Sequence, residues 1–208
     1  MKVIKPSYEI QTPIIKEEVY KHLERVGRTC YKSEDKITVD SAERFLRGIV
    51  SRGHESVIEH YSFSVKFICD RGVSHEIVRH RIFSFAQEST RYCNYSKDKF
   101  DGEITVIRPC FWPMDTKEYQ EWLDACLYAE RKYMNLLEGG AKPEEARSVL
   151  PHSLKTELVV TGNVREWRHF FRLRTSIAAH PQIREIAIPL LEELKQLLPV
   201  LFEDIKLD

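Results

Sequence analysis

The chain has 208 residues, 42% of them hydrophobic, and its 32 basic side chains equal its 32 acidic ones in number. This length suits one domain, which we place over residues 1–208, with a core that buries roughly 70% of the surface exposed in the unfolded chain. Since the net charge is zero, no global field attracts nucleic acid or an anionic membrane. We therefore predict no nucleic-acid partner, and any anion site must be local.

Neither a membrane span nor a signal peptide is predicted. No apolar run approaches the ~18 residues of a membrane span, and the first residues lead into polar sequence. We expect a cytoplasmic protein. The five cysteines are widely spaced and include no C-x-x-C pair, so neither a disulfide framework nor a structural zinc site is indicated, and we expect reduced thiols.

Two helices are predicted in the first quarter of the chain. Pro13 suits the first position of a helix whose apolar residues recur at helical spacing, and Gly27 predicts its end. Asp40 predicts the cap of a second helix, with an acid three residues later, and Gly53 predicts the end of that helix. The histidines of the following segment, His54 to His60, lack the spacing of a zinc protease, and we predict no metal.

The middle of the chain begins with its clearest strand. Residues 61–70 alternate between apolar and polar, which indicates a half-buried strand, and Gly72 predicts its end. We expect a helix from Val73 to Arg81, with Val73, Ile77 and Val78 facing inward, and an irregular loop from Ile82 to Tyr92. A second strand is expected over residues 104–108.

The second half of the chain is predicted to be mainly helical. The longest helix follows the turn at residues 113–115 and ends at Gly139-Gly140, and a short helix beginning at Pro143 carries Arg147. A third strand over residues 156–161 precedes a helix capped by Asn163, with Glu166 in the position of a capping box. The last long helix begins at Pro181. Its broad apolar stripe over residues 183–197 suits either burial within one subunit or a subunit interface, and Pro189 predicts a kink. Together these elements predict an α+β fold.

The segment from Arg79 to Tyr92 packs three arginines, a histidine and two serines into fourteen residues. Arginine forks match phosphate oxygens, and serine hydroxyls can complete such a site. The alternative is a solvated basic face. Since Ile82, Phe83 and Phe85 stand between the polar residues, we favour a fixed anion pocket.

This segment resembles the signature of the flavin-dependent thymidylate synthases: Arg-His-Arg, seven further residues, then Ser-x-Arg-Tyr. Gly53-His54-Glu55-Ser56 upstream and three arginine-bearing segments downstream resemble the same family, in the same order. The resemblance implies a single α+β domain with an antiparallel sheet flanked by helices. It also implies a homotetramer whose active sites are shared between subunits.

The resemblance further implies the conversion of dUMP to dTMP, with 5,10-methylenetetrahydrofolate as carbon donor and NADPH as reductant through FAD. Arg174 matches the family's activating arginine, which stabilises negative charge on the uracil, and no enzyme nucleophile such as Cys93 or Ser89 is required. The residues it assigns to FAD are Ser56, Arg79, His80, Arg81, Gln87, Asn163, Val164, Arg165 and His169. The residues it assigns to dUMP are Glu76, Arg79, Gln87, Glu88, Ser89, Thr90, Arg91, Arg147 and Arg174.

Some positions depart from the family or allow another interpretation. Ala86 and Gln87 stand where many members have Asn and Glu, His169 stands where others have Asn, and Ala178 stands where some have His. Cys30 matches a flavin-contacting position, although we favour a small buried cysteine there. Two alternative functions remain at this stage: a nucleotide- or RNA-binding module that uses the basic loop, and a flavin-binding member of the family without synthase activity.

Overall fold

The computed structural model describes residues 1–207 and divides into two compact units. Unit 1 comprises Met1–Ser7, Phe67–Arg79 and Phe85–Val159. Unit 2 comprises Tyr8–Lys66, His80–Ser84 and the residues from Val160 onward.

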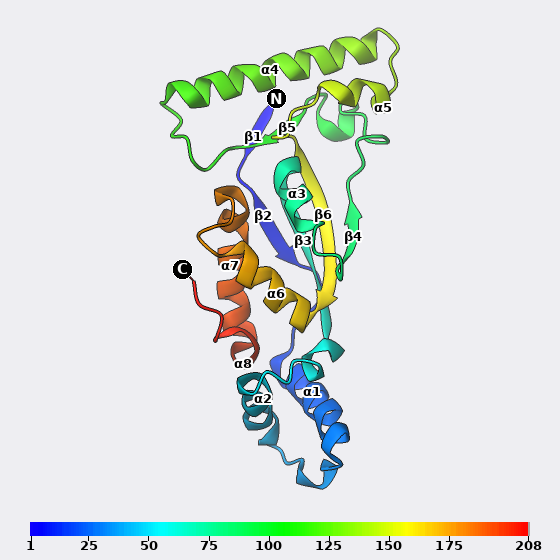
Figure 1. Ribbon diagram of the computed structural model, residues 1–208. Coiled ribbons are helices and arrows are strands. Elements are labelled where there is room, and N and C mark those ends of the chain that lie inside the picture. The colour runs from blue at the N-terminus through cyan, green and yellow to red at the C-terminus, as the bar shows by residue number, and fades with distance from the viewer. Residues whose placement is uncertain (208) are drawn as a thin grey trace. The chain divides into compact units, whose positions relative to one another are not determined.

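A four-stranded sheet has the order β2-β3-β6-β4, and its strands β3 and β6 run through both units. The alternation predicted for β3 is confirmed, because Phe63, Val65, Phe67 and Cys69 are all at most 1% exposed. Helices flank this antiparallel sheet, which confirms the predicted fold class, and a second, two-stranded sheet is described below (Figure 1). The strands are β2 (Ser7–Ile10), β3 (Ser62–Asp70), β4 (Ser84–Gln87) and β6 (Lys155–Asn163).

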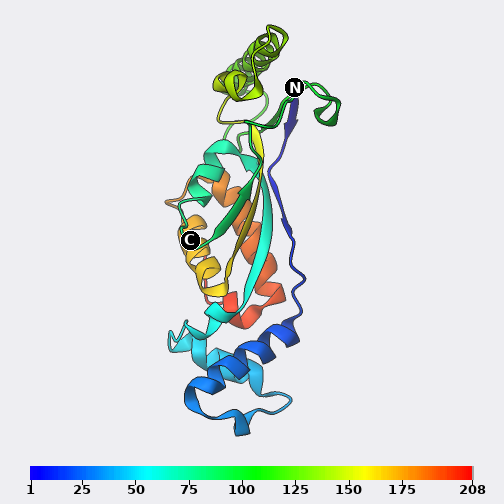
Figure 2. The same cartoon turned by 90° about the vertical axis from the view of Figure 1, so that its right-hand side faces the viewer.

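Unit 2 contains most of the buried apolar side chains of the helices. The ring of Trp167 on α6 stacks on Phe63 of β3, with ring centroids 5.1 Å apart, and its Nε1 donates to the Phe63 carbonyl at 3.3 Å. α1 and α2 lie side by side in both views (Figures 1 and 2). The helices are α1 (Lys16–Tyr31), α2 (Ser41–Ser51), α6 (Val164–Arg174), α7 (Pro181–Leu197) and α8 (Pro199–Phe202), with short 3-10 turns η1 (Glu34–Lys36) and η2 (Val57–His60).

The prediction for α1 is wrong at both ends. The helix begins at Lys16 rather than at Pro13, and it runs through Gly27 to Tyr31. Gly27 serves packing rather than termination, since a Cβ there would lie 2.5 Å from the Phe45 ring. Lys32, with φ 46°, ends the helix in the left-handed conformation.

The apolar stripe of α7 is buried within this chain. Ile183, Ala187, Leu190 and Leu194 are at most 1% exposed in unit 2. Of the two interpretations that the sequence left open, burial within one subunit is therefore the one that the structure supports. No helix in the described part of the chain is long and apolar enough to cross a membrane.

Unit 1 is built around the longest helix, α4, whose predicted end at Gly139-Gly140 is confirmed. β1 pairs with β5 in parallel, with Val3 opposite Val106. The core of this unit consists of Tyr95, Ile104, Val106, Cys126, Tyr133, Ala146 and Leu154. Its elements are β1 (Lys2–Ile4), α3 (Arg71–Ile77), η3 (Asp98–Phe100), β5 (Thr105–Ile107), α4 (Lys117–Glu138), α5 (Pro143–Ala146) and η4 (Arg147–Val149).

Three sequence predictions fail in and next to the basic segment. Gly72 does not end a strand but lies in α3, which starts directly after β3 because the Asp70 side chain accepts from the Val73 N–H at 2.8 Å. This helix ends at Ile77, so that Val78 is 37% exposed rather than inward-facing. The predicted loop from Ile82 to Tyr92 contains a strand, β4.

Candidate functional site

The residues that the sequence assigns to cofactor and substrate fall into two groups, one in each unit. Most of the flavin group lies in unit 2: Ser56, His80, Arg81, Asn163, Val164, Arg165, His169, and with them the catalytic candidate Arg174. Most of the nucleotide group lies in unit 1: Glu76, Arg79, Gln87, Glu88, Ser89, Thr90, Arg91 and Arg147.

Ser56 and Arg165, 109 positions apart in the sequence, line one cavity of about 440 Å³ in unit 2. We call it the Ser56 cavity. Cys30 also lines it and is exposed, so the interpretation as a buried cysteine is wrong. Across it, the Tyr31 hydroxyl and His54 Nδ1 form a hydrogen bond of 2.9 Å that ties α1 to the segment before η2. The lining residues are Cys30, Tyr31, Gly53, His54, Glu55, Ser56, Val57 and Arg165.

The charge of Glu55 in this cavity is balanced by three arginines of α6. Its carboxylate lies 3.0 Å from Arg172, 3.3 Å from Arg168 and 3.6 Å from Arg165. Burial of Glu55 opposes ionisation, but the hydrogen bond and charge of Arg172, followed by those of Arg168, outweigh it and lower the pKa of Glu55. Arg165 also pairs with Glu59. The cavity thus combines hydroxyl, imidazole and guanidinium donors with an acid that is already paired.

The predicted cap at the start of α6 is confirmed: Asn163 Oδ1 accepts from the Glu166 N–H at 2.9 Å. The Val164 N–H donates to the Tyr61 carbonyl at 3.0 Å. Two N–H groups at this helix end are therefore occupied inside the protein. A helix start has four such groups without a partner in the helix, so these contacts reduce the number that a ligand could use.

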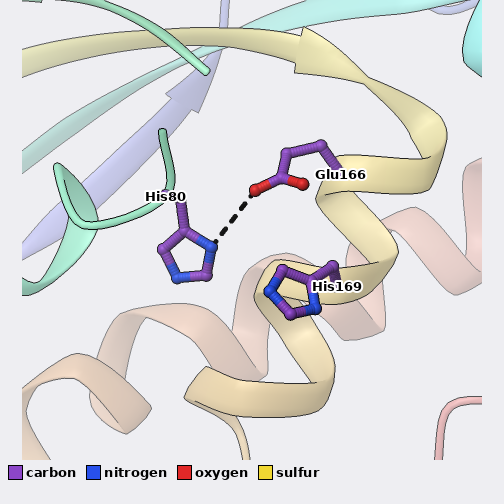
Figure 3. A group of neighbouring side chains, drawn as sticks. All are labelled: His80, Glu166 and His169. Atoms are coloured by element: carbon purple, nitrogen blue, oxygen red, sulfur yellow. Dashed lines mark ion pairs between the residues drawn. The ribbon is translucent and has the colours of Figure 1, made fainter. Parts of the chain in front are cut away.

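His80 lies in unit 2 in a cluster with Glu166, which is also buried, and His169, which is exposed (Figure 3). Its Nδ1 is 3.4 Å from the Glu166 carboxylate, and its Nε2 accepts from Arg174 Nε at 3.1 Å. The His169 ring lies edge-on, with centroids 5.6 Å apart. Burial, together with the charges of Arg174 and His169, lowers the pKa of His80 to about 4, so the imidazole is neutral at neutral pH.

The hydrogen bond from Arg174 identifies the tautomer of His80. Arginine can only donate, so His80 Nε2 must present its lone pair, and the proton of the neutral ring resides on Nδ1, facing Glu166. Ligand atoms of His80, Glu166 and His169 lie within 4.8 Å of one another, a spacing that a metal site also requires. A metal at Nδ1 of His80 would displace this proton, so we do not infer one.

In unit 1, the first half of the nucleotide group is anchored by hydrogen bonds within the protein. Gln87 Nε2 donates to Ser74 at 2.9 Å and to Thr156 at 3.2 Å. The Glu88 carboxylate accepts from the Tyr95 hydroxyl at 2.9 Å and from Lys155 Nζ at 3.0 Å. These contacts hold the chain after β4 in one conformation.

The second half of the nucleotide group is arginine-rich and more open to solvent. Arg79, Arg91 and Arg147 are exposed. Arg147 Nη1 donates to Thr90 Oγ1 at 3.4 Å, and Ser89 accepts from the backbone N–H groups of the two residues that follow Arg91. Glu76 is half-buried on α3. The structure thus brings Thr90 and Arg147 together, as the resemblance implies.

Cys93, directly after the basic segment, is half-buried and part of no disulfide. Burial, followed by the charge of Glu88, raises the pKa of the Cys93 thiol. Since the thiolate is the reactive form, this environment opposes a role as nucleophile.

Sequence reasoning missed the roles of Glu166 and Glu55. Glu166 was interpreted only as a capping-box acid, yet its side chain lies against His80. Glu55 was noted only as part of the upstream motif, yet it pairs with three arginines. The charged residues at i, i+3 and i+7 of α6, Arg165, Arg168 and Arg172, share one helix face and were the available signal for a common acidic partner.

Comparison with known proteins identifies the family. The model of the family described as thymidylate synthase complementing protein matches residues 16–200. The flavin-dependent thymidylate synthase of Pyrococcus horikoshii is 39% identical over 172 residues, which cover 80% of this chain and 70% of the relative. The enzyme of the same name from Geobacter sulfurreducens is 35% identical over 190 residues, which cover 86% and 78%.

Solved structures share the fold. A UMP/dUMP methylase, PolB from Streptomyces cacaoi, bound with 5-Br dUMP, superposes with a TM-score of 0.76 at 24% identity, over 98% of this chain and 96% of that one. The same protein bound with 5-Br UMP gives a TM-score of 0.76 at 22% identity, with 98% and 95% coverage. The family match and the relatives confirm the resemblance inferred from the Arg79–Tyr92 signature, and the chain belongs to the flavin-dependent thymidylate synthase family.

Proposed function

We propose that this chain is a methyltransferase that converts dUMP to dTMP, with FAD as cofactor, 5,10-methylenetetrahydrofolate as carbon donor and NADPH as reductant. The observation that carries the proposal is Arg174 held by a buried, neutral His80, in a chain of this family. A guanidinium keeps its positive charge at every physiological pH, as stabilisation of negative charge on a uracil ring requires.

The nucleotide group of unit 1 suits the phosphate and the base of dUMP. Arg79, Arg91 and Arg147 are exposed cations with bidentate donor geometry, which phosphate recognition favours. The hydrogen bond between Arg147 and Thr90 supports their assignment to one binding surface. Glu76, Gln87, Glu88 and Ser89 complete the proposed dUMP set, with the acids and amide suited to the polar edges of uracil.

The Ser56 cavity fits part of a flavin dinucleotide by the chemistry of its donors. It offers the Ser56 hydroxyl and the Arg165 guanidinium to an anionic or carbonyl-rich ligand, while the charge of Glu55 is neutralised by its arginine partners. When bound, FAD supplies the reducing equivalents of the reaction. His169 is exposed on α6, the helix that carries Arg165, and can donate a hydrogen bond. Because His80 Nε2 accepts from Arg174 and Nδ1 faces Glu166, a His80 contact with FAD would use its backbone.

The remaining proposed flavin contacts differ in what they can offer. Arg79 and Arg81 are exposed cations, whereas Val164 is fully buried. The side-chain oxygen of Asn163, Oδ1, already accepts the hydrogen bond that caps α6. Gln87 is held by Ser74 and Thr156.

We propose that the reaction uses no enzyme nucleophile. The raised pKa of Cys93 keeps its sulfur protonated at neutral pH, and Ser89 Oγ accepts a 3.4 Å hydrogen bond from the Arg91 N–H rather than pairing with a general base. Arg174 would then stabilise charge that develops on the uracil as reducing equivalents reach the ring.

We also propose a homotetramer with active sites shared between subunits. Since the apolar stripe of α7 is buried within the chain, other surfaces would form the interfaces of the tetramer. Light scattering of the active protein tests this proposal, and an active monomer would refute it.

The function is tested by purification followed by an assay for dTMP from dUMP. We expect yellow protein, bleaching of the flavin by NADPH without oxygen, and dTMP formation that depends on methylenetetrahydrofolate. Protein that binds FAD and dUMP but forms no dTMP would instead be a family member without synthase activity. Colourless protein that takes up no FAD would support the binding-module alternative.

A further inference from the structure

Arg174 is connected through His80 to a buried carboxylate that the proposed reaction does not use. We propose that Glu166 and His80 are positioning residues: Glu166 accepts the Nδ1 proton of His80, which leaves the Nε2 lone pair to accept from Arg174 Nε and set the plane of the guanidinium. This inference rests on the proposed function only where it assigns Arg174 to the reaction.

The direction of the hydrogen bonds between Arg174, His80 and Glu166 follows from the chemistry of arginine. Arg174 has no acceptor atom, so the 3.1 Å contact with His80 Nε2 has one possible direction. The neutral imidazole then carries its single proton on Nδ1, 3.4 Å from Glu166 Oε1. Without an acceptor at Glu166, the ring would lose its preference for this tautomer. The Nε2–H tautomer would point a proton at the guanidinium and break the bond to Arg174.

Packing holds the His80 ring in this orientation. His80 is 5% exposed, and its ring lies edge-on to Phe170 with centroids 5.1 Å apart. Phe83 lies on another side at 5.9 Å, in space left by Gly162, where a Cβ would overlap the Phe83 ring. A flip of the ring, which would place carbon atoms where the two nitrogens now lie, would therefore need several large side chains to move.

A histidine is needed because Glu166 cannot reach Arg174 along the helix. The two residues are eight positions apart on α6, which corresponds to roughly 12 Å of helical rise. His80, from the segment after α3, supplies the link between them. A carboxylate placed directly on Arg174 would offset its positive charge, whereas a neutral imidazole orients the guanidinium and leaves that charge in place.

Glu166 is suited to its part in this arrangement. It is 7% exposed and lies in the first turn of α6, where the helix dipole favours a negative charge. Burial raises the pKa of Glu166, and the charge of His169 opposes that rise. Both the ionised and the protonated carboxyl present an acceptor oxygen to His80 Nδ1, so the link does not depend on the charge of Glu166.

The test measures the tautomer of His80 by 15N NMR of histidine-labelled full-length protein, with its signals assigned by their loss in His80→Gln. In the unmodified protein we expect a protonated Nδ1 and an unprotonated Nε2 at neutral pH. Glu166→Gln, which keeps an acceptor oxygen, should preserve this pattern. Glu166→Leu should move the proton toward Nε2 and lower kcat roughly 10- to 100-fold, with a smaller change in KM for dUMP.

Glu24→Leu is the matched control, because Glu24 is a buried carboxylate of unit 2, 1% exposed, that accepts from Arg28 and Ser41. It should lower stability without changing the His80 signals. If Glu166→Leu does not fold, Arg174→Lys replaces it. That variant keeps the charge but lacks Nε, so the His80 Nε2 signal should shift while Nδ1 stays protonated.

Three results would overturn the proposal. One is a proton on Nε2 of His80 in the unmodified protein. The second is an unchanged tautomer and kcat in Glu166→Leu. The third is stoichiometric binding of added Zn²⁺ that shifts the signals of both His80 and His169. If no variant and no unmodified protein forms dTMP, the proposed function fails, while the NMR spectra still decide whether Glu166 positions His80.

Discussion

Replacing Arg168 by Met removes a buried cation that three acceptors share in unit 2. The Arg168 side chain is 1% exposed, and it donates to both oxygens of Asp204 at 2.7 Å, to Glu55 at 3.3 Å and to the Leu201 carbonyl. Methionine keeps much of the apolar stem of arginine, so the variant mainly tests the polar contacts.

The magnitude follows from what each acceptor can do after the change. The Leu201 carbonyl lies in a fully buried residue and loses its donor, which costs about 1–3 kcal/mol. Asp204 is 46% exposed and is rehydrated, so its screened contribution is about 0–1 kcal/mol. Glu55 keeps Arg172 as a partner. We therefore expect the free energy of unfolding to fall by roughly 1–4 kcal/mol, which lowers Tm by roughly 2–4 °C per kcal/mol for a chain of this size.

The control is Arg172→Met, which removes another partner of the same carboxylate. The Arg172 side chain is 46% exposed, so this change should cost at most about 1 kcal/mol. Urea unfolding followed by circular dichroism measures both variants. Equal losses in the two variants, or an Arg168→Met protein as stable as the unmodified one, would refute the reasoning from burial.

The pH dependence provides a second check. Despite the opposing effect of burial, Arg172 and Arg168 lower the pKa of Glu55, and Arg168 lowers that of Asp204, from ordinary values of 4.5 and 3.8. Groups with lowered pKa values stabilise the fold above their ordinary pKa and lose that effect as the pH falls through the lowered one. The difference in free energy of unfolding between the unmodified protein and Arg168→Met should therefore be constant above about pH 4.5 and shrink in stronger acid.

Three further predictions concern single residues. Arg174→Ala should lower kcat by about 10²–10³ while FAD stays bound, and unchanged turnover would remove Arg174 from the mechanism. Cys93→Ser should keep near-normal dTMP formation and Ser89→Ala should lower it without abolishing it; a uracil derivative trapped on either side chain in mass spectra, with complete loss of turnover in that variant, would contradict this. Gly162→Ala should destabilise the fold by about 1–3 kcal/mol in urea unfolding, because its Cβ would overlap Phe83, and an unaffected variant would show that the ring has room to move.

The sequence predicted those elements whose periodicity extends over many residues. β3 alternates over nine residues, and α4 carries its apolar stripe over 22, so both were found. β4 has four residues, too few to show a period, and it was interpreted as loop. Two glycines that were predicted to end an element lie inside helices instead. Gly27 is in α1 because it faces the Phe45 ring, and Gly72 lies in α3 beside the capping Asp70. In both cases a neighbouring side chain, invisible to local sequence, decides the outcome.

The candidate site was predictable through its motif but not through its contacts. The Arg79–Tyr92 signature identified the family, and through it the residues assigned to nucleotide and flavin, because residue types at fixed spacing are visible in the sequence. The link from Glu166 through His80 to Arg174 joins positions up to 94 apart, and no spacing rule relates them. The acid also satisfied a capping-box pattern, so its position already had a sufficient local explanation.

The contacts of the nucleotide group separate residues that shape the loop from residues that can meet a ligand. Glu88 is held by Tyr95 and Lys155, and burial together with Glu88 raises the pKa of Tyr95, so this hydroxyl remains a donor. Burial opposes the charge of Lys155, but hydrogen bonds with Glu157 and Glu88 outweigh it and raise its pKa, which keeps the ion pair intact at neutral pH. The chain after β4 is therefore ordered before any ligand arrives. Binding to an ordered chain costs less conformational entropy, so the exposed arginines beyond Glu88 would be available to the phosphate of the proposed substrate.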